Sequence, residues 1–147
     1  MTWRMATKQD CRLLAELNHQ LIADEGHRNP MSVAQLETRL RHWLEEGYEA
    51  VLFEKDGETA AYALYRAQPE EVYLRHFFVA RNRRRQGIGR EAMGLLRGHI
   101  WPATQRLAVS VLVENQAAIR FWRAMGYKDY CLTMEILPCG EVPAYDQ

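Results

Sequence analysis

The sequence predicts an α/β fold in which helices flank a central mixed sheet, with strands and helices in the order βααβββαβαβ. Three observations support this class. Segments rich in β-branched and aromatic residues alternate with segments whose apolar residues recur every three to four positions. An Asp56-Gly57 pair separates two apolar runs and marks a β-hairpin. Two glycines, Gly87 and Gly89, stand where a strand-like segment gives way to a helical one.

One domain accounts for the length of the sequence. The chain has 147 residues, of which 48% are hydrophobic, and this size and composition suit one core. We therefore expect a single domain over 1–147, with 138–147 as a tail that either wraps around the body or stays loose.

The first half of the chain is expected to contain a strand, two helices and a hairpin. Thr7 can cap the first helix, and Ser32 with Gln35 forms a capping box for the second, which Gly47 ends. The polar segment 24–30 between these helices is expected to be a loop. The expected elements are a strand at 3–5, helices built on the apolar stripes of 13–21 and 33–44, and strands at 49–54 and 59–65.

The second half is expected to alternate strands and helices. A strand at 72–79 leads into a helix at 88–100, and a strand at 107–113 leads into a helix at 116–125. The remaining segment has room for one last strand near 131–137 in place of a hairpin.

Charge and hydropathy exclude several classes of protein. Lysine plus arginine equals aspartate plus glutamate at 19 each, so the formal net charge is zero and nucleic acid is not an expected partner. No apolar run approaches the ~20 residues of a membrane span, and the opening residues do not form a signal peptide. We expect a cytoplasmic protein without a membrane partner, as a monomer or homodimer.

The cysteines and histidines predict neither disulfides nor metal. The three cysteines are odd in number and lack CxxC spacing, and the five histidines form no HxxxH pair. Free thiols are therefore expected.

The run from Arg84 to Arg90 predicts an anion-binding turn. Gly87 and Gly89 let the backbone direct its N–H groups toward one point, and the following helix adds four unpaired donors and its positive dipole end. A diphosphate would satisfy these donors. The spacing matches neither the dinucleotide fingerprint GxGxxG nor a P-loop, and an ordinary basic turn before a helix is the alternative interpretation.

A second block follows 26 residues after Gly89, where Asn115 opens a helix after a strand-like segment. Asn115 can cap this helix and Gly126 can end it. Helix capping explains these two residues, but it does not explain why both blocks occur in order, each after a strand.

Together the two blocks resemble the GNAT acetyltransferase superfamily. Its signature R/Q-x-x-G-x-G/A corresponds to Arg84-x-x-Gly87-x-Gly89, and its N-x-x-A-x-x-F-Y-x-x-x-G-F block corresponds to 115–127. The resemblance covers essentially the whole chain and implies a GNAT-type fold. The C-terminal hairpin usual in the family is shortened here, which leaves the substrate side either more open or completed by a neighbouring subunit.

The resemblance implies acetyl-CoA as acetyl donor and no metal. The family inserts the pantetheine arm between two splayed strands, so the backbone of Phe78 and Val79 would pair with it and the N–H of Val79 would face the thioester oxygen. The residues expected to bind the cofactor are Phe78, Val79, Arg84, Arg85, Gln86, Gly87, Ile88, Gly89, Arg90, Asn115, Ala118, Phe121 and Trp122.

The proton donor departs from the family pattern. Trp122 stands where the family often has a tyrosine whose hydroxyl lies near the sulfur, and an indole N–H is no proton source near neutral pH. Trp122 either packs against the pantetheine or steadies the thiolate. Tyr127 and Tyr130 are the alternative acids, and an ordinary aromatic role is the other interpretation of both.

Three residues of one strand are candidates for the base. Tyr73 lies near the position of a catalytic glutamate in some family members, Glu71 shares its face, and His76 lies on the opposite face with a suitable pKa. One route for the proton is a water relay to Glu71. His76 is a candidate base and a candidate substrate contact, and a purely structural role is its alternative interpretation. Asp24 and Glu25 could hold a cationic amine, or they are part of a solvated loop.

The predicted activity is therefore acetyl-CoA-dependent N-acetylation of a primary amine on a small molecule or peptide. The amine would attack directly in a ternary complex, because no Ser or Cys has the context of an activated nucleophile, with Cys131 the one rival. A non-catalytic domain that binds and senses acyl-CoA is the alternative function.

Overall fold

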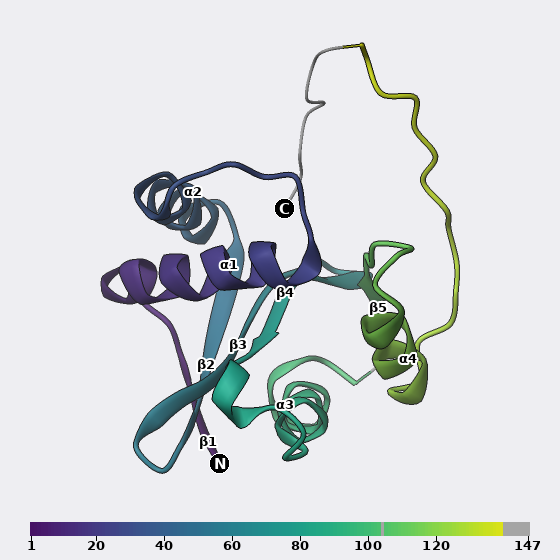
Figure 1. The fold of residues 1–147 in the computed structure, drawn as a ribbon. Coiled ribbons are helices and arrows are strands. Elements are labelled where there is room, and N and C mark those ends of the chain that lie inside the picture. Colours follow the sequence, from purple (N-terminus) through teal and green to yellow (C-terminus); the bar gives the residue numbers. More distant parts are fainter. Residues whose placement is uncertain (104, 140–147) are drawn as a thin grey trace.

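The computed structural model describes residues 1–103 and 105–139 and has a five-stranded mixed sheet flanked by helices (Figure 1). The strands lie in the order β1-β2-β3-β4-β5, and only the β4–β5 pair is parallel. The predicted α/β class with a mixed sheet is confirmed. The strands are β1 Thr2–Met5, β2 Tyr48–Lys55, β3 Glu58–Ala67, β4 Glu71–Val79 and β5 Arg106–Val109.

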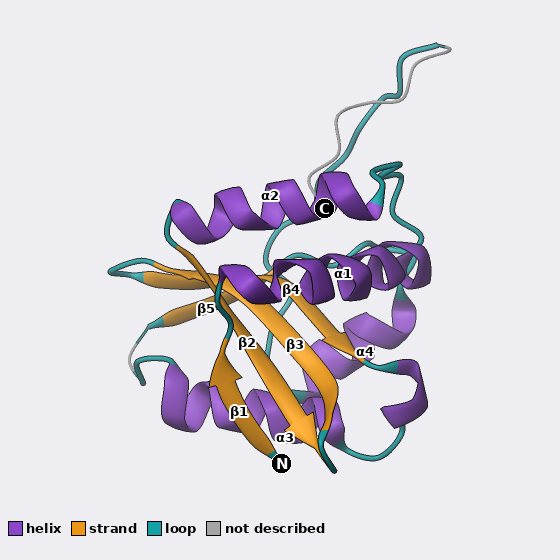
Figure 2. Cartoon of the chain, turned by 90° about the vertical axis from the view of Figure 1, so that its left-hand side faces the viewer, coloured by secondary structure: helices purple, strands orange, loops and turns teal. Residues whose placement is uncertain are grey.

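Four α-helices cover the two faces of the sheet. Figures 1 and 2 show α1 and α2 on one face and α3 and α4 on the other. Each layer has its own buried cluster, one around Leu14, Leu36 and Tyr62 and one around Phe53, Met93 and Trp122. The helices are α1 Cys11–Glu25, α2 Val33–Glu45, α3 Ile88–Leu95 and α4 Gln116–Ala124.

Local sequence signals correctly predicted a capping box and a hairpin in the first half of the chain. The amide of Gln35 donates to the Ser32 hydroxyl at 3.2 Å, and the Ser32 amide donates to the Gln35 side chain at 2.8 Å, which is the predicted capping box. Asp56 and Gly57 have φ values of 55° and 77°, the left-handed pair that a two-residue hairpin turn needs.

Thr7, expected to cap the first helix, instead precedes a 3-10 turn at Lys8–Asp10. At its other end, α1 runs on through residues 24 and 25, which were expected to lie in a loop.

A β-bulge in β4 changes which face its residues occupy. Leu64 pairs with His76 but Tyr65 pairs with Leu74, so Arg75 is the extra residue of the bulge. Leu74 points into the cluster under α3, so Tyr73 points to the α2 face, where His76 also lies against Trp43. The prediction that His76 and Tyr73 occupy opposite faces was wrong, because strict alternation fails at the bulge.

Three elements of the second half differ from the predicted ranges. The helix expected at 88–100 ends as α3 at Leu95 and continues as a π-helical turn, η3 Leu96–Ile100, with Trp101 donating to the Leu96 carbonyl at 2.7 Å. The strand expected at 107–113 forms only as β5 Arg106–Val109, and residues 110–113 are not part of a strand. The last strand expected near 131–137 is absent: these residues have no strand pairing, and the tail beyond 139 lies outside the described residues.

Candidate active site

β4 and β5 pair at their beginnings and then separate, which leaves a gap between the last two strands of the sheet. They pair from Glu71 with Arg106 to Leu74 with Val109, and β4 then runs on to Val79 without β5 beside it. At the point of divergence the Tyr73 hydroxyl donates to the Ser110 hydroxyl at 3.1 Å. The gap therefore exposes one edge of β4 on which an extended ligand could pair.

The backbone of Val79 faces this gap. The Ala80 amide donates to the Ala60 carbonyl of β3 at 2.8 Å, and backbone groups alternate along a strand, so Val79 and Phe77 are directed to the opposite edge. This orientation agrees with the predicted role of the Val79 N–H. The backbone of Phe78 faces β3 instead, and its side chain is buried in the α1–α2 layer.

The turn after β4 has the conformation of an anion cradle. Arg85 and Gly87 both have positive φ, at 64° and 76°, and α3 begins at Ile88 directly after them. A cavity of about 330 Å³ opens at this turn. The first N–H groups of α3 have no partner within the helix, so their donors are available to a ligand at the helix start.

Most of the predicted cofactor residues line this cavity. Its lining is Val79, Arg83, Arg84, Arg85, Gly87, Ile88, Gly89, Arg90, Phe121, Ala124 and Met125. Of the other predicted residues, Asn115 caps α4 by accepting from the Ala118 amide at 3.2 Å. The lining residues that were not predicted are Arg83, Ala124 and Met125. Ala124 and Met125 follow Phe121 by three and four positions and so share its helix face.

Gly89 sets the distance between α3 and α4. A Cβ at Gly89 would lie 3.1 Å from Cε1 of Phe121, closer than ordinary contact. A Cβ at Gly87 would meet nothing within 4 Å, so that position needs glycine for its backbone conformation.

The arginines around the cradle divide into paired and available groups. Arg81 and Arg84 bind the Asp24 carboxylate at 2.7 and 2.6 Å, and Arg83 binds Asp56 at 3.1 Å. Arg85 and Arg90 are exposed, and no ion pair to them is found within the described part of the chain. Two positive charges are thus left at the start of α3.

The structure places Asp24 beneath the cradle. Burial by itself raises the pKa of Asp24, but hydrogen bonds from Arg81 and Arg84 outweigh it and lower the pKa below its usual value. Because both arginines occupy this carboxylate, it anchors the cradle to the end of α1. Glu25 lies 3.0 Å from Nε2 of His27.

Trp122 belongs to an aromatic cluster on the α3–α4 face. Its ring is 8% exposed, and its centroid lies 4.9 Å from that of Phe121 and 5.5 Å from that of Phe77 on β4. Tyr127 packs against it at 5.3 Å. Burial raises the pKa of the Tyr127 hydroxyl to about 12, and this oxygen has no hydrogen-bond partner among the described residues.

A cationic and aromatic cluster lies on the other face, where β4 bulges. Arg75 donates to the Tyr48 hydroxyl at 3.1 Å, and its guanidinium carbon lies 4.9 Å from the centre of the Trp43 ring. His76 is 1% exposed, and its Nδ1 lies 3.2 Å from the Tyr62 hydroxyl. The Arg75 guanidinium carbon also lies 5.9 Å from the centre of the Tyr73 ring, so Arg75, which the sequence did not single out, lies beside one predicted residue and next in sequence to His76.

The other predicted residues lie farther from the gap. Glu71 forms an ion pair with Arg106 where β4 and β5 are still paired, three residues and about 10 Å before Leu74. Tyr130 is highly exposed on the C-terminal segment, with the Arg106 guanidinium 4.9 Å above its ring.

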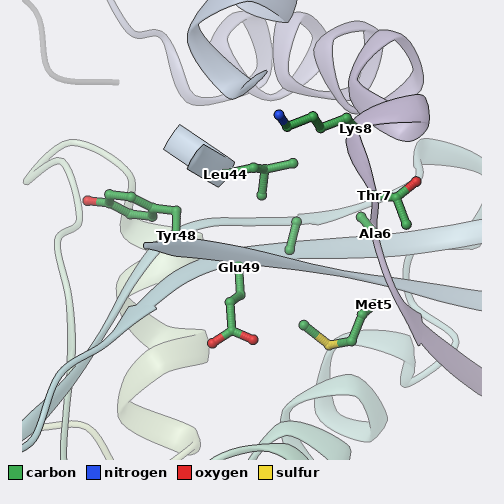
Figure 3. A pocket seen from close by; sticks show the side chains of 8 residues that line it. Met5, Ala6, Thr7, Lys8, Leu44, Tyr48 and Glu49 are labelled. Carbon is green, nitrogen blue, oxygen red and sulfur yellow. The ribbon is translucent and has the colours of Figure 1, made fainter. Parts of the chain in front are cut away.

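A second hollow, of about 380 Å³, lies between β1 and the end of α2. Figure 3 shows Lys8, Leu44 and Tyr48 around it. None of the predicted site residues lines it, and the Lys8 amine is paired with Glu45 at 2.8 Å.

Metal sites and membrane-spanning helices are both absent from residues 1–103 and 105–139. In that part of the chain no group of three or more His, Cys, Asp or Glu side chains is placed to hold a metal ion. No helix in the same ranges is long and apolar enough to cross a membrane.

Known structures share this architecture. A possible acetyltransferase from Clostridium difficile 630 superposes with a TM-score of 0.77 at 14% identity, covering 95% of this chain and 98% of that one. A predicted acetyltransferase from Clostridium acetobutylicum, solved with acetyl-CoA, gives 0.69 at 14% identity, covering 92% and 95%. Ribosomal-protein-alanine N-acetyltransferase from Brucella melitensis biovar Abortus 2308 also gives 0.69 at 14% identity, covering 92% and 98%.

At the level of sequence, no curated protein matches the chain. The model of the acetyltransferase (GNAT) family matches residues 13–127, a range that contains the strand gap, the cradle and α4. The chain therefore belongs to the GNAT family of acetyltransferases.

Proposed function

We propose that this protein transfers the acetyl group of acetyl-CoA to a primary amine of a small molecule or peptide. The observation that carries the proposal is the junction of two features: the open edge of β4 ends directly at the cradle that begins α3. A donor with a diphosphate at one end and a thioester at the other matches this combination. The family membership and the neighbour solved with acetyl-CoA support the same donor.

The donor would lie along β4 with its diphosphate at the cradle. The N–H groups of the first turn of α3, together with Arg85 and Arg90, would bind the phosphates. The pantetheine arm would pair with the edge of β4. The N–H of Val79, or that of Phe77 about 7 Å farther from the cradle, would polarise the thioester oxygen.

The amine would approach from the α2 face, where the strands diverge beside Tyr73 and Arg75. Attack forms the N–C bond and breaks the C–S bond, so the ammonium loses a proton and the CoA thiolate gains one. We assign the proton lost by the ammonium to a water relay that ends at Glu71. Tyr127 or solvent would assist protonation of the CoA thiolate. Tyr127 stays protonated at neutral pH because its pKa is raised to about 12, so its hydroxyl would donate a hydrogen bond to the leaving thiolate while solvent supplies the proton.

Thiol release in the presence of amines tests the activity. The full chain is incubated with acetyl-CoA and a panel of amines, peptides and polyamines, and free CoA thiol is measured. Release that requires an amine and yields the N-acetylated product supports transfer. A protein that binds acetyl-CoA but releases no thiol with any amine fits the sensing alternative, which Trp122 at the usual tyrosine position favours. A protein that binds no CoA contradicts both functions.

A further inference from the structure

The C-terminal segment Tyr130–Leu137 has the residue alternation of an amphipathic strand but belongs to no sheet. Its apolar side chains alternate with Cys131, Thr133 and Glu135, which is the period of a strand with one buried face. That face is nevertheless exposed: the exposed fractions are Tyr130 86%, Leu132 58%, Met134 83% and Ile136 98%. Four large apolar side chains on one face in solvent are unusual for a folded chain and indicate a missing surface.

The sheet has a corresponding defect at β5. This strand is last in the order β1-β2-β3-β4-β5, so its outer backbone edge has no partner strand in the described chain. The four residues after it, 110–113, have no regular structure, although Leu112 and Val113 are apolar and exposed. An open edge of this kind readily accepts another strand.

The segment does not pair with the edge of its own chain. It starts close to β5, since the Arg106 guanidinium lies 4.9 Å above the Tyr130 ring. It then runs away from the sheet and projects past α1 and α2, as Figures 1 and 2 show. An ion pair between Arg28 and Glu135, with contacts of 2.7 and 3.1 Å, attaches it to the α1–α2 loop.

We propose that two copies of the chain exchange this segment, so that Tyr130–Leu137 of each copy adds a strand to the β5 edge of the other. One copy supplies an unpaired segment of eight residues, and the other supplies the edge of β5 at 106–109, which pairing would extend into the irregular residues 110–113. The exchange is reciprocal and closes with twofold symmetry, and it pairs the β5 edge of each copy while giving each apolar segment a sheet to join. The exchanged strand would also support the β5 side of the donor gap, and so complete the substrate side from a neighbouring subunit.

Solution mass tests the association. Light scattering on the full chain should give about twice the 17.2 kDa of one chain. Met134→Asp, on the apolar face, should shift the mass to that of one chain, whereas Thr133→Asp, one position away on the polar face, should leave the dimer intact. A wild-type mass of one chain, or a dimer that Met134→Asp does not weaken, overturns the proposal.

Cross-linking tests the exchange itself and does not depend on disruptive variants. Cys139 is replaced by Ser, Cys131 is kept, and a second cysteine is placed in turn at Arg106, Ala108 and Ser110 along β5. Exchange predicts that mild oxidation of one of these variants gives a covalent dimer on a non-reducing gel. A covalently closed monomer would show pairing within one chain, and no cross-link at any position would show that the segment does not reach β5; either result overturns the proposal. Neither readout involves acetyl transfer, so this test is independent of the proposed activity.

Discussion

The Asp24 carboxylate at the end of α1 lies 2.6 Å from Nη2 of Arg84 in the cradle, 60 residues later in the chain. The same carboxylate also binds Arg81 at 2.7 Å. One acidic side chain therefore pairs with two arginines and holds the turn before α3 against the opposite layer of the molecule. In the proposed function, phosphate binding would fall to Arg85 and Arg90, which Asp24 does not reach.

Asp24→Asn should loosen the cradle and destabilise the fold. Hydrogen bonds to a charged group contribute up to ~3 kcal/mol, but both arginines are largely exposed, so we expect a loss of about 1 kcal/mol in the free energy of unfolding. The pKa of Asp24 is lowered in the folded state, so its contribution is complete above the ordinary aspartate pKa and disappears as the pH falls through the lowered value. Urea unfolding of both proteins at several pH values should show a difference at pH 7 that shrinks in acid. An equal difference at all pH values would contradict this assignment.

Substitution of Gly87 should abolish CoA binding without unfolding the chain. At φ 76° an L residue is strained by ~1–2 kcal/mol, and more for a β-branched one, so Gly87→Val should distort the cradle. Gly89→Ala should weaken CoA binding less, because a shift of the Phe121 ring by a few tenths of an ångström would accommodate the added Cβ. Gly94→Ala is the control: it lies in α3, its added Cβ meets nothing within 4 Å, and affinity should be unchanged. If Gly87→Val bound CoA with wild-type affinity in a calorimetric titration, the assignment of the cradle as the CoA site would be wrong.

Arg85→Gln and Arg90→Gln should each weaken CoA binding about fivefold, or about 1 kcal/mol, since exposed charge pairs contribute little more than that. The loss should diminish at high salt, because salt screens exposed charges. Arg12→Gln on α1, whose partners are Glu16 and Glu37, should leave the affinity unchanged. A titration in which the Arg12 variant loses as much as the cradle variants would point to net charge instead of local contacts.

Trp122→Phe should retain most of the turnover, because Trp122 packs among Phe77, Phe121 and Tyr127 and has no titratable proton in the working range. Trp122→Tyr should keep or raise the rate, and its pH profile should gain a high-pH limb if the new hydroxyl acts as an acid. Steady-state kinetics with the amine found in the thiol-release assay measures both. A hundredfold loss of kcat in Trp122→Phe at unchanged CoA affinity, about 2.7 kcal/mol, would instead show that the indole N–H acts on the reaction.

Local signals in the sequence determined the elements and the cradle. The capping box at Ser32, the hairpin at Asp56-Gly57 and the left-handed Gly87 depend on residues within a few positions of one another, and all have the expected conformation. The order of elements followed from hydrophobic periodicity. The mixed sheet and the strand-to-helix turn could therefore be predicted without any long-range contact.

Only the tertiary structure decided the contacts between distant segments. The bulge at Arg75 exists because β3 pairs with β4, and it moves His76 onto the face of Tyr73. Asp24 is chemically suited to hold an amine, but two arginines far along the chain occupy it. The segment Tyr130–Leu137 has the alternation of a strand, yet it forms none within the chain. Alternation records only which side chains seek burial, whereas a strand also needs a backbone edge to pair with, and the position of that edge is set by the assembled fold.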